Sequence, residues 1–213
     1  LEWSMVGFMA LGGTSFVVLA RLLEGKAKSL RRSTEIKAYY AVIVCATLSI
    51  FGFLLLDPTH QAPFGDSLRQ AAFQVVSILT TTGYATTDFN AWLPVTHIIL
   101  LLLMVVGGCS GSTAGGAKVI RFVVTLKLCL QQIEKAYRAH VVRTLRVNGK
   151  SLSPEDQKGI LVYMVMLGMV VFASLLVVSL LEPHLSLEGS VSAMAACLFN
   201  IGPGFAEVGP TQN

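Results

Sequence analysis

The chain has 213 residues, of which 54% are hydrophobic and 13% are charged, and its formal net charge at pH 7 is +4. Soluble domains carry about 25% charged residues, and a mean hydropathy of +0.67 is too high for a chain that folds around one water-soluble core. These values exclude a soluble globular protein, and we predict an all-α membrane protein.

Four apolar stretches are long enough, or nearly so, to cross the roughly 30 Å hydrocarbon layer of a bilayer. They are residues 3–23, 39–56, 93–106 with its continuation, and 160–181. The first is cut short by the N-terminus, with no initiating Met or basic segment before it. We therefore expect the chain to be part of a longer protein.

Lys and Arg are confined to two parts of the sequence. All but Arg69 of the 16 basic residues fall in residues 21–37 or 118–158. By the positive-inside rule, these two parts face the cytoplasm. The stretches between them carry acids instead, namely Asp57, Asp66, Asp88, Glu182, Glu188 and Glu207. An acidic outer face concentrates cations, although such acids also serve solubility.

The sequence contains an internal repeat that is visible when its apolar runs are aligned on their ends. Two runs end in an acid followed by proline, at residues 57–58 and 182–183. Each is followed by a short segment, residues 67–79 or 188–199. About a dozen residues make a helix of roughly 18 Å, which is half of a bilayer. Neither short segment can therefore span the membrane.

Because both basic parts lie on the cytoplasmic side of the membrane, each short segment must enter the membrane from outside and return to the outside, as a re-entrant pore helix does. Irregular backbone at that depth requires surrounding protein or a water-filled cavity. Asp66 or Ser67 is suited to cap the first helix, and Ser186 or Glu188 the second. The C-terminal carbonyl ends of both helices would point to the membrane centre, where they attract a cation.

A glycine follows each short segment, Gly83 within a threonine-rich turn and Gly202 before Pro203. A potassium ion sheds its water only if several oxygens replace it, and backbone carbonyls do so without adding formal charge. Turning successive carbonyls toward one axis requires a residue that can take unusual φ values. Two such segments cannot enclose an ion, so four are needed, from the rest of the protein or from further subunits.

Five glycines lie within residues 107–116, directly after the apolar stretch 93–106. Each glycine costs a helix roughly 1 kcal/mol relative to alanine. We therefore predict a broken helix that resumes over residues 117–130, a feature typical of transport pathways. A glycine-rich loop at the membrane edge is the alternative.

Residues 131–158 read as a connector, with a turn at Asn148-Gly149 and a helix start at residues 153–156. Its basic stripe, Lys135, Arg138, Arg143 and Arg146, favours retention on the cytoplasmic side over binding of lipid or protein. Cys45, Cys109, Cys129 and Cys197 show no paired spacing and are expected to be packing residues. The four histidines, at positions 60, 97, 140 and 184, show no metal-binding spacing.

Two short stretches of the sequence partly match enzyme motifs. A phosphate-binding loop at residues 111–118 lacks the adjacent Gly-Lys-Ser/Thr and a preceding strand. Residues 108–111 match the short Gly-x-Ser-Gly motif of rhomboid-type intramembrane proteases, which need a general base next to the serine. His97 would lie on the order of 20 Å from Ser110 along the helix. We therefore predict no enzyme.

Three motifs together resemble the membrane subunit of the Trk/Ktr/HKT potassium transporter superfamily, nearest the bacterial Trk branch. They are residues 80–86 (TTTGYAT), 107–121 (GGCSGSTAGGAKVIR) and 200–204 (NIGPG). The resemblance implies repeated units of membrane helix, re-entrant pore helix and membrane helix around a potassium pathway. It implies a homodimer in a lipid bilayer, a cytoplasmic nucleotide-binding regulatory subunit and no nucleic-acid partner.

The resemblance assigns functional residues by position. The third filter strand is Thr81, Thr82, Gly83 and Tyr84, and the fourth is Asn200, Ile201, Gly202 and Pro203. The intramembrane gating loop comprises Gly107, Gly108, Ser110, Gly111, Ser112, Thr113, Gly115, Gly116 and Lys118. Filter carbonyls alone would hold the transported K+, and no cofactor is expected. Because the fourth strand does not copy the third, a sodium-permeable member of the same superfamily is the alternative.

The resemblance divides the chain into four parts. Residues 1–38 are the end of the second repeat and a cytoplasmic connector, and residues 39–130 are the third repeat with its broken inner helix. Residues 131–159 are a second cytoplasmic connector, and residues 160–213 are the fourth repeat up to its filter. The expected function is potassium uptake across the bacterial inner membrane by a multi-pass protein.

Overall fold

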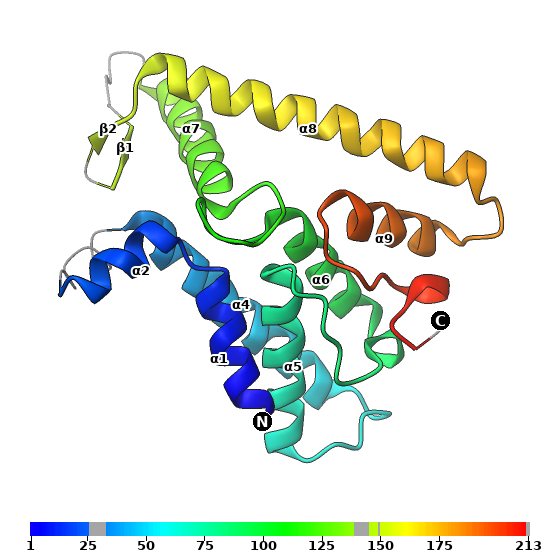
Figure 1. Cartoon of the computed structure of the whole chain (residues 1–213). Helices are drawn as coiled ribbons and strands as arrows, with labels where there is room; N and C mark the ends of the chain where they lie inside the picture. Colours follow the sequence, from blue (N-terminus) through cyan, green and yellow to red (C-terminus); the bar gives the residue numbers. More distant parts are fainter. Residues whose placement is uncertain (26–32, 139–144, 149, 212–213) are drawn as a thin grey trace.

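A computed structural model describes residues 1–25, 33–138, 145–148 and 150–211. Helices form nearly all of the regular structure (Figure 1), so the predicted all-α class is confirmed. The longer ones are α1 (Glu2–Gly12), α2 (Phe16–Leu23), α4 (Thr34–Leu56), α5 (Phe64–Leu79), α6 (Pro94–Val106), α7 (Val119–Tyr137), α8 (Pro154–Leu181) and α9 (Leu187–Leu198). Two short 3-10 turns, η1 (Phe89–Ala91) and η2 (Ala206–Val208), follow α5 and α9 respectively.

Helix α5 is the centre of the core. It contacts α1, α4 and α6, and every residue from Ala71 to Leu79 is buried. Its apolar side chains meet Ile50 and Leu54 of α4 and Leu100 of α6 in one cluster. The segment that is too short to span the membrane is therefore covered on all sides over its last two turns.

Two described helices, α4 and α8, are long and apolar enough to cross a membrane. A third span results only if α1 and α2 are counted together, because the chain bends by 103° between them. The apolar stretch 3–23, expected from the sequence as a candidate span, is thus two helices with a sharp bend between them. At the bend, Gly13 lies so close to α4 and α5 that an added Cβ would clash with the Tyr39 hydroxyl and lie 2.8 Å from Thr80 Cγ2.

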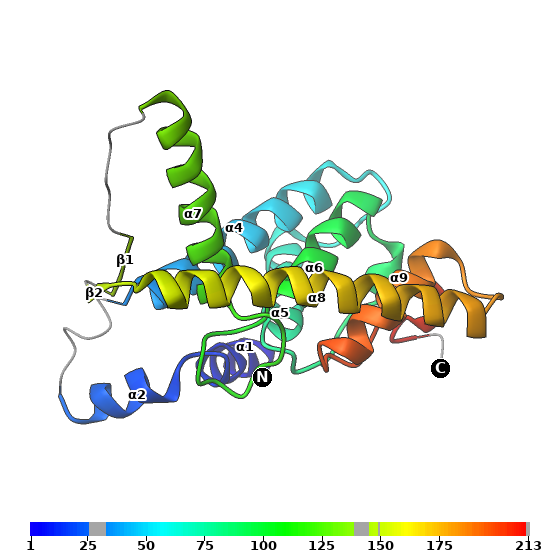
Figure 2. The ribbon, with the colours of Figure 1, turned by 90° about the horizontal axis from the view of Figure 1, so that it is seen from above.

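Helix α8 lies at the edge of the molecule (Figure 1), where its main helix contacts are with α7 and α9 (Figure 2), and its Leu167 and Val171 pack against the core. None of its residues is buried. It begins at Pro154, before the apolar stretch 160–181, and the Ser153 hydroxyl accepts a hydrogen bond from the Asp156 amide at 3.1 Å. This confirms the predicted helix start, with proline at the first helical position.

The connector contains a small hairpin that the sequence did not predict. Strands β1 (Arg146–Val147) and β2 (Lys150–Ser151) pair antiparallel. Asn148 has φ 53°, as a two-residue hairpin turn requires, whereas Gly149, Arg143 and His140 lie outside the described residues. The Asn148 side chain accepts a hydrogen bond from the Thr34 amide at 2.7 Å, which docks the hairpin on the start of α4.

The predicted cap of the first short helix is wrong. Helix α5 begins at Phe64, with Pro63 in the capping position and no side-chain cap. Ser67 instead donates to the Pro63 carbonyl at 3.3 Å, because the fixed φ of proline starts the helix one turn earlier. In α9 the predicted cap is confirmed, since Ser186 accepts a hydrogen bond from the Gly189 amide at 3.0 Å.

Candidate functional site

Helices α5 and α9 end in the same backbone geometry. After α5, Thr82 N donates to Ser77 O and Thr81 N to Ile78 O, at 2.9 and 3.0 Å. After α9, Ile201 N donates to Ala196 O and Asn200 N to Cys197 O, at 2.9 and 3.3 Å. Both pairs make the Schellman motif, in which one left-handed residue closes a helix. That residue is Thr81 (φ 54°) in the first case and Asn200 (φ 57°) in the second.

The matching helix ends fix the alignment of the two repeats. Thr81 corresponds to Asn200, Gly83 to Gly202 and Tyr84 to Pro203, as the sequence predicted. Both glycines have positive φ, 75° for Gly83 and 118° for Gly202. The equivalence is therefore a property of the backbone, although the side chains differ.

Carbonyl oxygens are left free just after each helix end. Among the described residues, no hydrogen bond is accepted by the carbonyls of residues 81–83 or 200–203. The Tyr84 carbonyl differs, because it accepts a hydrogen bond from the Ser77 hydroxyl at 2.6 Å. Unsatisfied carbonyls at the C-terminal ends of two helices form a partially negative surface.

Residues 81–84 and 200–203 lie side by side. An added Cβ on Gly83 would clash with the Ile201 carbonyl oxygen and would lie 3.3 Å from Pro203 Cδ. An added Cβ on Gly202 would lie 3.9 Å from Gly83 Cα. The structure thus brings together the two predicted filter strands, which are far apart in the sequence.

Each returning strand is tied to its own helix by a serine. Ser77 of α5 binds the Tyr84 carbonyl. Ser192 of α9 accepts a hydrogen bond from the Phe205 amide at 2.8 Å. Both serines are buried, at 0% exposure, and they fix the distance between each helix and the segment that follows it.

Residues 107–116, here called the glycine loop, separate α6 from α7 and confirm the predicted break. The two ends of the loop touch: an added Cβ on Gly116 would lie 2.6 Å from Gly107 Cα, and both glycines have positive φ. The Ala117 amide donates to the Val105 carbonyl and the Val119 amide to the Gly108 carbonyl, at 3.0 and 3.1 Å. The chain therefore leaves the end of α6 and returns to nearly the same place before α7 begins.

The glycine loop lies directly against the ends of α5 and α9. The Gly115 amide donates to the Thr81 hydroxyl at 2.7 Å. A Cβ added to Gly115 would clash with the Phe199 carbonyl, at the end of α9. Only glycine fits at this position, because the Phe199 backbone approaches it from one side and the Thr81 side chain from the other.

The other side of the glycine loop rests on the bend between α1 and α2. The Cys109 amide donates to the Gly13 carbonyl at 2.9 Å, and the Phe16 amide donates to the Gly111 carbonyl at 3.0 Å. The Thr113 hydroxyl donates to the Gly12 carbonyl at 3.1 Å. The loop thus joins three parts of the chain that are remote in the sequence.

Two charged residues lie at the glycine loop. The Glu35 carboxylate, from the first turn of α4, accepts a hydrogen bond from the Ser110 amide. The Lys118 ammonium donates to the Ala114 carbonyl. Sequence reasoning included Lys118 but missed Glu35, whose signal is a lone acid at the start of an apolar helix, a common placement for acids in any helix.

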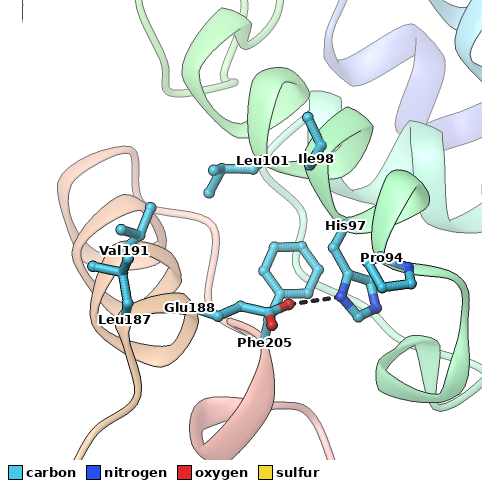
Figure 3. Close-up of a pocket in the computed structure, with 8 residues that line it drawn as sticks. All are labelled: Pro94, His97, Ile98, Leu101, Leu187, Glu188, Val191 and Phe205. Atoms are coloured by element: carbon cyan, nitrogen blue, oxygen red, sulfur yellow. Dashed lines mark hydrogen bonds and ion pairs between the residues drawn. The ribbon is translucent and has the colours of Figure 1, made fainter.

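The structural role of His97 was not predicted from the sequence either. One ring nitrogen lies 2.6 Å from a Glu188 carboxylate oxygen and the other 2.8 Å from the Phe89 carbonyl. The ring stacks on Phe205 at 5.1 Å. His97 and Glu188 together close one side of an open, mainly apolar pocket of about 300 Å³ between α6 and α9 (Figure 3). His97 is fully engaged there, so it forms no catalytic pair with Ser110.

Within the described part of the chain, no group of three or more His, Cys, Asp and Glu residues could hold a metal ion. All four cysteines are free, and only Cys109 is buried in the core. The packing role predicted for cysteine therefore applies to Cys109, while Cys45, Cys129 and Cys197 are exposed on their helices.

Comparison with known proteins places these features in a family. The family model described as cation transport protein TrkH matches residues 40–212. The Trk system potassium uptake protein TrkI of Halomonas elongata is 33% identical over 214 residues, which cover 100% of this chain and 42% of that protein. The Trk system potassium uptake protein TrkH of Vibrio parahaemolyticus is 32% identical over 83% of this chain and 36% of its own length.

The crystal structure of the potassium transporter TrkH from Vibrio parahaemolyticus has the same fold, with a TM-score of 0.87 and 28% sequence identity. The match covers 98% of this chain and 44% of that one, so the chain spans less than half the length of these relatives. The chain therefore belongs to the TrkH family of cation transport proteins, which are multi-pass membrane transporters and not enzymes.

Proposed function

We propose that the protein containing this chain takes up potassium across the bacterial inner membrane, and that residues 81–84 and 200–203 form part of its selectivity filter. The observation that carries the proposal is the pair of matching helix ends with adjacent glycines and free carbonyls. Carbonyl oxygens replace the hydration shell of an alkali cation. The negative ends of α5 and α9 favour a positive charge at the same place.

In this function the chain forms two quarters of a pore. Helices α5 and α9 are its re-entrant pore helices, and α4 and α8 are the outer helices of the third and fourth repeats. Two further filter strands come from parts of the protein outside this chain. A homodimer and a cytoplasmic nucleotide-binding regulatory subunit belong to the same proposal, by resemblance to the superfamily.

The glycine loop is proposed as the gate of this pathway. Its Gly115 contacts Thr81 and lies against Phe199, so the loop sits at the end of both proposed filter strands. A backbone loop that can move without unfolding a helix is suited to open and close a narrow passage. Potassium permeation would then require the loop to leave its described position.

Sodium permeation is the second candidate, because the two strands carry different residues at Tyr84 and Pro203. A filter whose strands differ has fewer equivalent carbonyl sites than a fourfold symmetric one. Potassium is favoured because the relatives from Halomonas elongata and Vibrio parahaemolyticus are named potassium uptake proteins.

Growth rescue tests the proposal. The full-length gene should restore growth at low potassium to a bacterium that lacks its own uptake systems, whereas the empty vector should not. Western blotting of membranes verifies that the protein is present. Absence of rescue by a protein that is present in the membrane would contradict the proposed function, and rescue accompanied by sodium accumulation would favour the second candidate.

A further inference from the structure

Glu35 is buried at the start of α4. Its residue exposure is 8%, next to Ile36 at 4%. The Ser33 hydroxyl caps the helix by accepting from the Ile36 amide at 3.4 Å, so the carboxylate itself is not used as a cap. The helix N-terminus favours a negative charge in this turn, but a buried carboxylate still needs a hydrogen-bond donor.

The partner of Glu35 belongs to the glycine loop. Its Oε1 accepts a hydrogen bond from the Ser110 amide. Lys118, at the far end of the loop, attracts the carboxylate electrostatically and donates to the Ala114 carbonyl. A carboxylate therefore holds the first half of the loop, and an ammonium holds the second half.

The other hydrogen bonds described between the loop and the rest of the chain are made by neutral groups. They involve the backbone of Gly12, Gly13 and Phe16 and the hydroxyl of Thr81. A hydrogen bond from an amide to a carboxylate is roughly twice as strong as one between neutral groups. Glu35 also lies on a different element from the proposed filter, so it can hold the loop without lining the ion site.

We propose that Glu35 is a positioning residue that latches the glycine loop in its described, closed conformation through Ser110. Loss of the carboxylate leaves the Ser110 amide without its acceptor and frees the first half of the loop. Only the expected effect of the latch on ion uptake rests on the proposed function. Its effect on loop position is independent of what the protein transports.

Cys109 reports on the latch directly, because it is adjacent to Ser110 and has 0% exposure. In the full-length protein with Cys109 as its single cysteine, the rate of labelling by N-ethylmaleimide measures opening of the loop. Glu35→Ala should raise that rate roughly tenfold, given the strength of hydrogen bonds to charged groups. Glu35→Gln keeps an acceptor oxygen and should fall between Glu35→Ala and the unchanged residue.

Lys37→Ala is the matched control, since Lys37 is an exposed charged residue in the same helix and should leave labelling unchanged. Rubidium uptake is measured on the same proteins and should rise with labelling. If both Glu35 variants are folded and label Cys109 at the unchanged rate, the latch is wrong.

A fall in uptake at an unchanged labelling rate would also overturn the latch, because it would mean that Glu35 serves the permeating cation. If the unchanged protein carries no rubidium, the proposed function fails. Cys109 labelling then still decides the latch, so the two failures are distinguishable.

Discussion

Thr81 and Asn200 occupy the same left-handed position at the ends of α5 and α9 but reach it at different cost. Asparagine enters this conformation readily, whereas a β-branched residue there is an outlier. Thr81 is held there by its hydroxyl, which accepts the Gly115 amide at 2.7 Å. The strain at Thr81 therefore coincides with a side-chain hydrogen bond between the proposed filter and the glycine loop.

Thr81→Val should destabilise the protein by about 1–3 kcal/mol, because it leaves the Gly115 amide without an acceptor at nearly unchanged side-chain size. Thermal unfolding of the full-length protein in detergent measures the loss. Thr47→Val is the control, since the Thr47 hydroxyl is buried and has no partner among the described residues. The control should unfold at the same or a higher temperature, and equal losses in both variants would contradict the account.

Glu207 ties the end of the second proposed filter region to the start of α9. Its carboxylate accepts hydrogen bonds from the Ser186 hydroxyl at 2.9 Å and the Ser186 amide at 3.3 Å. The backbone amide of Glu207 itself and the Ser186 hydroxyl hold the pKa of this carboxyl below its usual range. The unfolded chain therefore binds the proton more tightly than the folded chain does.

Because folding lowers the pKa of Glu207, its stabilising effect is fully present above the ordinary glutamate pKa of about 4.3. The effect is lost as the pH falls through the lower pKa of the folded state. Glu207→Gln should lower the unfolding temperature at pH 7, and the difference from the unchanged protein should persist down to about pH 4.3 and shrink as the pH falls further. A difference that stays constant below that pH would show that the carboxylate charge is not involved.

The individual residues of the site were predictable to different degrees. Gly83 and Gly202 follow short apolar segments, so local sequence reveals them. Glu35 and His97 meet their partners across 75 and 91 residues, and such contacts exist only after the helices pack. No local pattern distinguishes these two residues from ordinary charged groups at helix ends.

At the scale of elements, the lengths of the helices were more predictable than their ends. The apolar runs locate α4, α5 and α6 closely, because burial requires a continuous apolar stretch or face. The start of α5 was misplaced because Pro63 takes the role expected of Asp66 or Ser67. The bend at Gly13 was missed because its cause is close packing against Tyr39 and Thr80.

The glycine loop is long for a link between two helices, and its middle rests on the bend between α1 and α2. Shortening it within residues 111–115 should raise rubidium uptake several-fold, because the loop would no longer reach the ends of α5 and α9. Thr113→Ala, which keeps the loop length, should change uptake less. Unchanged or reduced uptake by a shortened loop in a folded protein would count against its role as a gate.

At the scale of the whole molecule, the chain has the form of two similar units joined by α7 and the hairpin (Figure 1). One unit is α4 and α5 with residues 81–84, and the other is α8 and α9 with residues 200–203. Helix α8 has no buried residue, and its exposed side chains are apolar over most of its length. Such an apolar surface is suited to contact lipid or other membrane helices.

The repeat was predictable from the sequence because both repeats have a long apolar run, a short segment and a glycine in the same order. This order is the same although the side chains differ. The convergence of both glycines on one point was not predictable in detail. It depends on how α5 and α9 pack against α6 and the glycine loop, which requires contacts among all four elements.

Gly83 is proposed to lie in a cation filter shared by both repeats. Rubidium uptake into vesicles containing the purified full-length protein, with potassium or sodium as competitor, tests this assignment. Gly83→Ser introduces a side chain at φ 75° against the Ile201 carbonyl and should reduce the preference for potassium over sodium by roughly tenfold, as a loss of about 1.4 kcal/mol implies.

Gly65→Ala is the matched control, because Gly65 lies in the same helix α5 and an added Cβ there meets nothing within 4 Å. Potassium should compete strongly and sodium weakly in the unchanged protein and in Gly65→Ala, and sodium should compete well only in Gly83→Ser. An unchanged competition profile in a folded Gly83→Ser protein would contradict the assignment of residues 81–84 to the filter.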